Sequence, residues 1–187
     1  MSRGRVHLMR SSHDCVVTSS KTVIDDNPLL NCRIDGLQRK SPTRIVIDKS
    51  LKIPIKSNIV KSSASIKTII FYNKSNKRKI KLLKKFKIKL YKVSLDQNSK
   101  INLKKVLFCI QKLGFSRIFL ESGISLIKSF LIEKLIDEFK IFISNKSIGI
   151  NGTSNFRKDY NFFIKSYKCK NEKVNLFGDK LLSYKLK

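Results

Sequence analysis

Residues 13–33 have the sequence HDCVVTSSKTVIDDNPLLNCR, and they bring three kinds of functional group together in a lysine-rich chain. The apolar run at 15–17 predicts a strand, and the small hydroxyl residues at 18–20 predict a turn after it. A brief helical turn is expected at 21–24. It ends before the Asp-Asp-Asn-Pro turn at 25–28, because the residue before a proline disfavours the helical conformation. The stretch therefore holds a hydroxyl cluster, a carboxylate pair and, beyond the turn, an arginine.

The rest of the chain alternates between apolar runs with strand character and stretches with helical periodicity. Asn98 or Ser99 is expected to cap a helix that runs to Leu113, and Gly114 is expected to stop it. This alternation, followed by antiparallel strands, predicts an α/β fold with a mixed sheet flanked by helices. Strands are predicted at 44–48, 68–72, 117–120, 139–144, 160–168, 172–177 and 181–186, and further helices at 3–12 and 124–134.

The length and composition indicate one domain with a real core, since the chain has 187 residues and 41% of them are hydrophobic. No apolar run reaches the roughly 18 residues that cross a membrane. The basic N-terminus, MSRGRVHLMR, is not followed by an apolar segment, so it does not have the pattern of a secretory signal. We therefore expect a soluble, cytoplasmic protein without a membrane partner.

The net charge of +28, from 41 Lys and Arg against 13 Asp and Glu, favours polyanionic partners. A general bias of the amino-acid composition toward lysine explains the same charge.

Residues 74–89 contain nine basic residues and no acidic one. They could form an arm for nucleic acid or phosphate, or a helix or strand with solvated lysines. The alternation of Phe86, Ile88 and Leu90 with lysines is typical of a strand and favours the second interpretation.

The chain shows no metal-binding or acyl-transfer signature. None of the cysteines Cys15, Cys32, Cys109 and Cys169 is spaced as Cys-x-x-Cys, and the two histidines lie close to the N-terminus. No histidine or cysteine is placed as a nucleophile and its base. We expect no metal ligand in this chain.

A second group of functional residues follows the predicted strand at 117–120. Glu121-Ser122-Gly123 forms the loop, and a helix begins after it. A helix start favours anions through its N–H groups and its dipole, and Gly123 lets the backbone approach a phosphate closely. A carboxylate such as Glu121, at the end of a buried strand, is either solvated or directed at a ligand.

These residues together resemble the reductase domain of the bifunctional riboflavin-biosynthesis deaminase/reductase. The resemblance covers most of the chain to about residue 150 and rests on four ordered motifs. They are an arginine on the first helix, a Thr-Val-x-x-Asp-[Asp/Asn]-Pro-x-Leu-x-x-Arg segment, an Arg-x-Val-x-Asp strand, and Glu-[Ala/Ser]-Gly. The matching segments are RVHLMRSSHDCVVTSSKTVIDDNPLLNCR (5–33), PTRIVIDKSLKIP (42–54) and RIFLESGISLIKSFLIEKLIDEFKIFIS (117–144).

The resemblance implies a dihydrofolate-reductase-like fold and the reduction of 5-amino-6-(5-phosphoribosylamino)uracil to its ribityl form with NADPH as cofactor. A homodimer is expected, with a phosphorylated pyrimidine as substrate and no specific nucleic acid. Asp26 is expected at the reacting centre as the catalytic residue. The implied substrate contacts are Arg10, Leu30, Arg33 and Glu121, and the implied cofactor contacts are Thr22, Asp26, Lys49, Gly123, Ile124 and Ser125.

Three differences from the family accompany the resemblance. The family's domain begins with a strand and a tryptophan-containing loop, whereas this chain starts at the following helix and has no tryptophan. The zinc deaminase domain is absent, and Lys49 replaces the family's usual serine. We therefore expect residues 1–187 to be a single reductase domain that lacks its first strand. Two other hypotheses stay open: a basic nucleic-acid-binding protein centred on 74–89, and an inactive fragment of the reductase.

Overall fold

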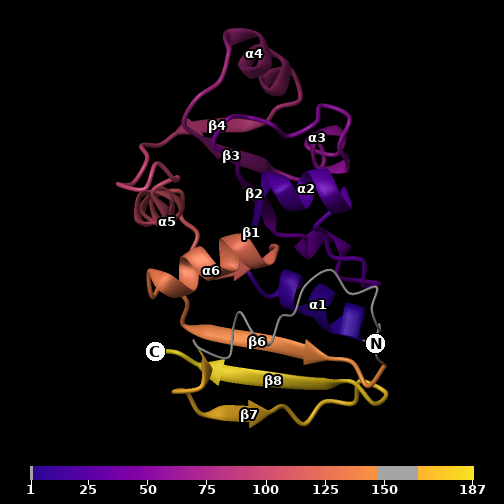
Figure 1. Cartoon of the computed structure of the whole chain (residues 1–187). Helices are drawn as coiled ribbons and strands as arrows, with labels where there is room; N and C mark the ends of the chain where they lie inside the picture. The colour runs from indigo at the N-terminus through magenta and orange to yellow at the C-terminus, as the bar shows by residue number, and fades with distance from the viewer. Residues whose placement is uncertain (1, 147–163) are drawn as a thin grey trace. The chain divides into compact units, whose positions relative to one another are not determined.

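The apolar runs between residues 6 and 126 form one parallel sheet in the computed structural model, which describes residues 2–146 and 164–187 (Figure 1). The strand order is β4-β3-β2-β1-β5, and all neighbouring strands are parallel. β1, β2 and β3 are almost fully buried, as is usual for a parallel sheet covered on both faces. The strands are β1 (Cys15–Ser19), β2 (Thr43–Ile47), β3 (Thr68–Tyr72), β4 (Lys89–Lys92) and β5 (Ile118–Leu120).

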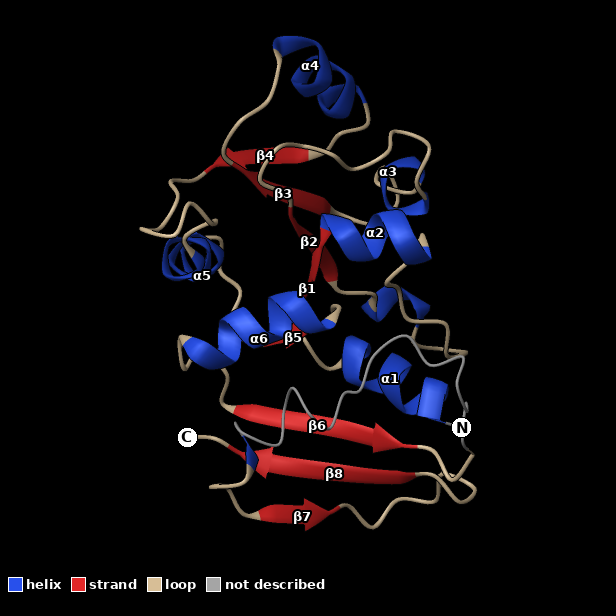
Figure 2. Ribbon diagram, in the orientation of Figure 1, coloured by secondary structure: helices blue, strands red, loops and turns tan. Residues whose placement is uncertain are grey.

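Helices cover both faces of this sheet. One face packs in a hydrophobic cluster with Val23 of α2, Ile59 and Val60 of α3, and Leu83 of α4. Figure 2 shows α5 on the opposite side of the sheet from α2 and α3. The helices are α1 (Ser2–Ser11), α2 (Ser20–Asp26), α3 (Asn58–Lys61), α4 (Lys77–Lys85) and α5 (Leu103–Lys112), with a 3-10 turn η1 (Gln38–Lys40).

The path of the chain through the sheet creates a switch point between β1 and β5. From β1 the chain adds strands in one direction as far as β4, and it then returns through α5 to place β5 on the other side of β1. Ser19 ends β1, and Glu121 directly follows β5. In open α/β sheets the carboxyl ends of strands at such a point form a crevice in which ligands bind.

The C-terminal part forms a separate unit with a three-stranded antiparallel sheet of order β6-β8-β7. α6 (Ile124–Ile132) precedes it in the chain. The strands are β6 (Glu138–Ile143), β7 (Cys169–Asn171) and β8 (Lys180–Lys185). The predicted α/β class with parallel and antiparallel strands is thus confirmed, and the two strand types form separate hydrogen-bonded sheets within the described residues.

The tail was predicted only in part. The strand at 181–186 is confirmed by β8, but the strand at 172–177 is wrong. The amide of Val174 donates to the carbonyl of Glu172 at 2.9 Å, a tight turn that bends the chain out of the extended conformation. Of the strand predicted at 160–168, residues 160–163 lie outside the described residues. Residues 164–168 contain a turn, and β7 begins only at Cys169.

Two further boundaries differ from the sequence-based expectation. The helix expected from residue 98 or 99 begins at Leu103, because the side chain of Asn102 accepts the amide of Lys105 at 3.0 Å. Ser99 lies in a preceding turn with a positive φ of 56°. The basic stretch at 74–89 contains α4, and the following strand starts at Lys89 rather than near Phe86. A nucleic-acid role for this stretch stays a prediction.

Among residues 2–146 and 164–187, no helix combines the length and the apolar character needed to cross a membrane. The expectation of a missing first strand stays a prediction.

Candidate active site

Three hydroxyl groups and one backbone amide meet where β1 and β5 end. The Oγ of Ser19 lies 3.0 Å from the Oγ1 of Thr22, and the Oγ of Ser122 lies 3.2 Å from each of these two oxygens. The amide of Gly123 donates to the Oγ1 of Thr22 at 3.1 Å. Ser19 also caps α2 by accepting the amide of Thr22 at 3.2 Å. This cluster ties the loop after β1 to the loop after β5.

Gly123 presents an open stretch of backbone beside this cluster. The residue is exposed, and a Cβ added to it would meet only the Oγ1 of Thr22, at 3.7 Å. α6 begins at the next residue, so the positive end of its dipole lies beside the glycine. Backbone of this kind accommodates a closely approaching anionic group.

Arg10 and Glu121 form a two-pronged ion pair at the same end of the sheet. The Nε of Arg10 donates to the Oε2 of Glu121 at 2.8 Å, and its Nη2 donates to Oε1 at 2.7 Å. The Arg10 side chain is 10% exposed and that of Glu121 is 30% exposed. Parallel hydrogen bonds of this kind fix the orientation of both groups. The glutamate keeps exposed lone pairs, whereas most donors of the arginine are already used.

The segment from Leu30 to Arg33 is anchored by the same helix. The Nη1 of Arg10 donates to the carbonyl of Asn31 at 2.9 Å, and the Nδ1 of His7 accepts the amide of Arg33 at 3.2 Å. Leu30 adopts a positive φ of 51°, and its side chain is only 3% exposed in the core. The substrate contact expected of Leu30 stays a prediction. The side chain of Arg33 is exposed.

The pKa of His7 is lowered from its ordinary value, first by burial and second by the positive charge of Arg10. Arg33 lowers it further, while the Asn31 carbonyl and Glu121 act in the opposite direction. In the unfolded chain the pKa returns to about 6.5. Below that value the unfolded state binds more protons, so acid is expected to destabilise the folded state.

We expect the free energy of unfolding to fall as the pH drops from roughly 7.5 to 5, with a part of this fall due to His7. Urea denaturation at several pH values measures it. His7→Gln, which keeps a side-chain acceptor without a titrating ring, should show a shallower loss over the same range. Equal slopes for both proteins would contradict this role of His7.

The structure separates the two aspartates of α2. Asp25 pairs with Lys21 at 2.8 Å on an exposed face of the helix. Asp26 is exposed and has no hydrogen-bonding partner among the described residues. It lies four residues after Thr22, so both side chains project from the same face of α2. Asp25, three residues after Thr22, lies near the same face. The two aspartates therefore differ in that Asp25 is paired with Lys21, whereas the side chain of Asp26 has no hydrogen bond among the described residues.

Lys49 and its neighbour Asp48 follow β2, beside β1. Asp48 is 1% exposed, and its two oxygens accept the amides of Lys52 and Ile53 at 2.9 and 2.8 Å. It therefore organises its own loop rather than facing a ligand. The ammonium of Lys49 donates to the carbonyl of Ser99 at 2.6 Å and is otherwise exposed. The cofactor contact expected of Lys49 stays a prediction.

Sequence reasoning did not assign a role to three residues that hold the site together: His7, Ser19 and Ser122. The spacing of His7 and Arg10 was the available signal for the histidine, because residues three apart share one face of a helix.

Among the described residues, no group of three or more His, Cys, Asp or Glu side chains could hold a metal ion.

Comparison with known proteins assigns the chain to a family. The model of the family described as "RibD C-terminal domain" matches residues 1–182. The chain belongs to this family. The resemblance drawn from the four motifs is therefore confirmed.

Two curated relatives match most of the chain at 28% identity. The riboflavin biosynthesis protein RibD of Aquifex aeolicus is 28% identical over 183 residues, which are 98% of this chain and 49% of the relative. The 5-amino-6-(5-phosphoribosylamino)uracil reductase of Buchnera aphidicola is 28% identical over 158 residues, 79% of this chain and 73% of the relative. The chain thus spans about half the length of the Aquifex relative.

Solved structures of this family share the fold. RibD of Acinetobacter baumannii has a TM-score of 0.73 at 19% identity, covering 98% of this chain and 50% of that one. The riboflavin biosynthesis reductase Rib7 of Saccharomyces cerevisiae has a TM-score of 0.71 at 18% identity, covering 98% and 80%. The dihydrofolate-reductase-like α/β fold is confirmed.

Proposed function

We propose that this chain reduces 5-amino-6-(5-phosphoribosylamino)uracil to its ribityl form in riboflavin biosynthesis, with NADPH as the reductant. One observation carries the proposal: the Ser19–Thr22–Ser122 cluster with Gly123 and the Arg10–Glu121 pair lie together at the switch point of the sheet. The reductase name of the Buchnera relative supports it.

The residues after β1 and β5 fit a nicotinamide cofactor. The exposed backbone at Gly123 admits a phosphate, and the start of α6 at Ile124 and Ser125 contributes a favourable dipole. Thr22 holds this loop in place. Lys49 offers an exposed ammonium at the end of the neighbouring strand. NADPH, when bound, supplies the hydride, and the protein supplies position and electrostatics.

The substrate would be held by groups of complementary chemistry. Glu121, oriented by Arg10, can accept hydrogen bonds from hydroxyl or amino groups. Arg33 has an exposed guanidinium suited to the phosphate. His7 and Arg10 fix the main chain that leads into it, through the amide of Arg33 and the carbonyl of Asn31. The structure therefore favours Glu121 as the contacting group and Arg10 as the group that orients it.

Reduction of the ribosyl group adds a hydride to the anomeric carbon, breaks its bond to the ring oxygen, and requires a proton on that oxygen. We assign this proton transfer to the carboxyl group of Asp26, which lies on the same face of α2 as Thr22. Asp25 is already paired with Lys21 and is not assigned a role.

The full chain should oxidise NADPH in the presence of the substrate and yield the ribityl product. Thr22→Val keeps the shape of the side chain but removes the acceptor of the Gly123 amide. We expect it to raise the KM for NADPH about tenfold, which corresponds to about 1.4 kcal/mol, with a smaller change in the KM for substrate. Steady-state kinetics with each substrate varied measures both values. An unchanged KM for NADPH in Thr22→Val would contradict the proposed contact of Thr22 with the cofactor loop. A wild-type chain that does not oxidise NADPH would contradict the proposed function.

A homodimer remains part of this proposal. Sedimentation of the purified chain tests it.

A further inference from the structure

The described part of residues 6–126 contains a cavity of about 590 Å³ at the amino ends of the strands of the parallel sheet. Thr43, which opens β2, and Lys67, which directly precedes β3, both line it. The cavity therefore lies at the amino ends of these strands, whereas the candidate active site lies at the carboxyl ends of β1 and β5. Its volume falls in the usual range of small-molecule sites.

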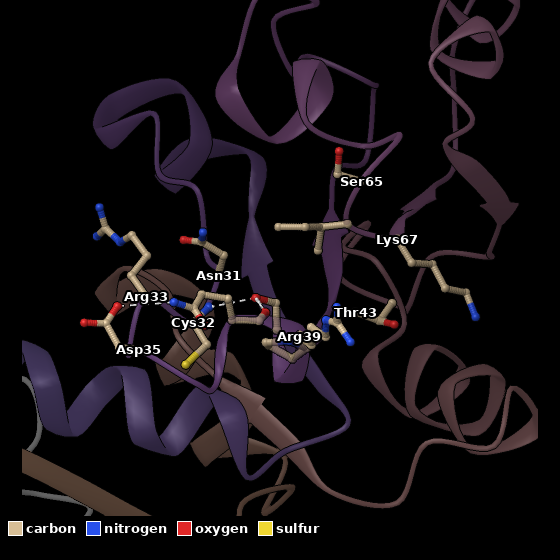
Figure 3. A pocket seen from close by; sticks show the side chains of 12 residues that line it. Asn31, Cys32, Arg33, Asp35, Arg39, Thr43, Ser65 and Lys67 are labelled. Carbon is tan, nitrogen blue, oxygen red and sulfur yellow. Dashed lines mark hydrogen bonds between the residues drawn. The ribbon is translucent and has the colours of Figure 1, made fainter.

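The lining of this cavity is strongly cationic (Figure 3). It contains Arg33, Arg39 and Lys67 but one acid, Asp35. The side chains of the three cations have no hydrogen bond or ion pair among the described residues. In Figure 3, Arg39 lies between Arg33 and Lys67. Arg33 and Arg39 are thus unpaired among the described residues, and the ammonium of Lys67 lies 5.2 Å from the centroid of the Phe115 ring.

Other groups of the cavity are hydrogen-bonded in a way that holds its wall. The Oγ of Ser41 accepts the amide of Cys32 at 3.1 Å and donates to the carbonyl of Gln38 at 2.7 Å. The Nε2 of Gln38 donates to Asp35 at 3.2 Å, which engages the acid within the wall. These contacts give the loop that carries Arg39 a defined backbone.

We propose that this cavity binds a small phosphate-bearing ligand, separate from the reductase substrate. The guanidinium of Arg39 matches the geometry of phosphate oxygens, and the ammonium of Lys67 adds a point charge, while Arg33 stays assigned to the phosphate of the reductase substrate. The hydroxyl groups of Thr43 and Ser65 lie in the same lining and supply neutral donors. The size of the cavity suits a metabolite rather than a polymer.

The ligand would also meet a segment that belongs to the candidate active site. Asn31 and Arg33 line the cavity, while the carbonyl of Asn31 accepts from Arg10 and the amide of Arg33 is held by His7. Arg39 and Lys67 are not among the residues of the candidate active site. They are therefore the residues with which the two sites can be tested separately.

Titration of the isotope-labelled full chain with pyrophosphate, followed by amide resonances at constant ionic strength, tests the proposal. We expect saturable shifts at 31–43 and 65–67 with a dissociation constant below about 1 mM. Arg39→Gln with Lys67→Gln should weaken binding at least about tenfold, because two charge-assisted contacts are lost. Lys104→Gln with Lys105→Gln changes the net charge equally on the exposed face of α5 and should leave the affinity unchanged.

Three results would overturn the proposal. An equal loss of affinity in the control variant would reduce it to non-specific charge. Shifts confined to the loop at Gly123 would place the phosphate in the cofactor site instead. A rise in the KM for the reductase substrate in the Arg39 and Lys67 variant would make the cavity part of the substrate site. Because binding is measured without turnover, the result is independent of the proposed reductase activity.

Discussion

Asp26→Asn is expected to lower the rate of substrate reduction by about a thousandfold, the order of effect that loss of a proton-transferring group produces. The asparagine has nearly the same shape but cannot pass a proton to the ring oxygen of the ribosyl group. Asp26 is exposed and has no partner among the described residues, so the fold should not change. NADPH oxidation measures the rate, and thermal unfolding checks the stability.

Asp25→Asn is the matched control, because it alters the neighbouring carboxylate of the same helix, which is already paired with Lys21. It removes an exposed ion pair with Lys21, which is expected to contribute little to stability or turnover. The two variants should therefore differ by more than a hundredfold in kcat. Reduction at the wild-type rate in Asp26→Asn would remove the proton-transfer role while leaving the family membership intact.

The sequence identified the two loops that form the candidate site, because each combines strong local signals. Residues 13–33 contain a strand and a helix limited by Pro28, and Glu121-Ser122-Gly123 follows an apolar strand. The hydroxyl residues 18–20 do not form the predicted turn, because Thr18 and Ser19 end β1 and Ser20 begins α2. Their meeting depends on the strand order, which places β5 beside β1 rather than beside β4. Local periodicity contains no information about that order. The family resemblance supplied it indirectly.

The pairing of Arg10 with Glu121 shows a second limit of sequence reasoning. Both residues were expected to contact the substrate, yet they bind each other across 111 positions of the chain. A motif indicates that a residue matters, but not which of its atoms face a ligand. Leu30 illustrates the same point, because its position was expected at the substrate while its side chain is buried in the core.

The strand predicted at 44–48 begins with a fully buried arginine. Arg44 is 0% exposed, and its guanidinium contacts five partners in the surrounding loops, α3 and β3. They are the carbonyls of Leu29, Ile59 and Ile66 at 3.1, 3.0 and 2.9 Å and the hydroxyls of Ser62 and Thr68 at 2.7 and 2.8 Å. Burial lowers the pKa of Arg44 to about 10, so the side chain remains charged at neutral pH.

Arg44→Met is expected to lower the free energy of unfolding by about 3–5 kcal/mol, a large part of the total for a single domain. Replacing a buried ion pair by apolar residues can be neutral when both partners are replaced. Here three of the acceptors are main-chain carbonyls that no side-chain substitution removes, so they lose their donor while still buried. Urea denaturation measures the change. Arg39→Met, which alters an exposed arginine, should change stability by less than about 0.5 kcal/mol.

The same substitution should reach the candidate active site, because the carbonyl of Leu29 precedes the segment that positions Arg33. In the fraction of Arg44→Met that remains folded, we expect the KM for substrate to rise more than the KM for NADPH, each relative to the wild type. The reason is that the cofactor loops at Thr22 and Gly123 do not contact Arg44. Equal stability of the methionine variant and the wild type would mean that water replaces the arginine as donor. Arg44→Lys, with fewer donors in a different geometry, should fall between the two.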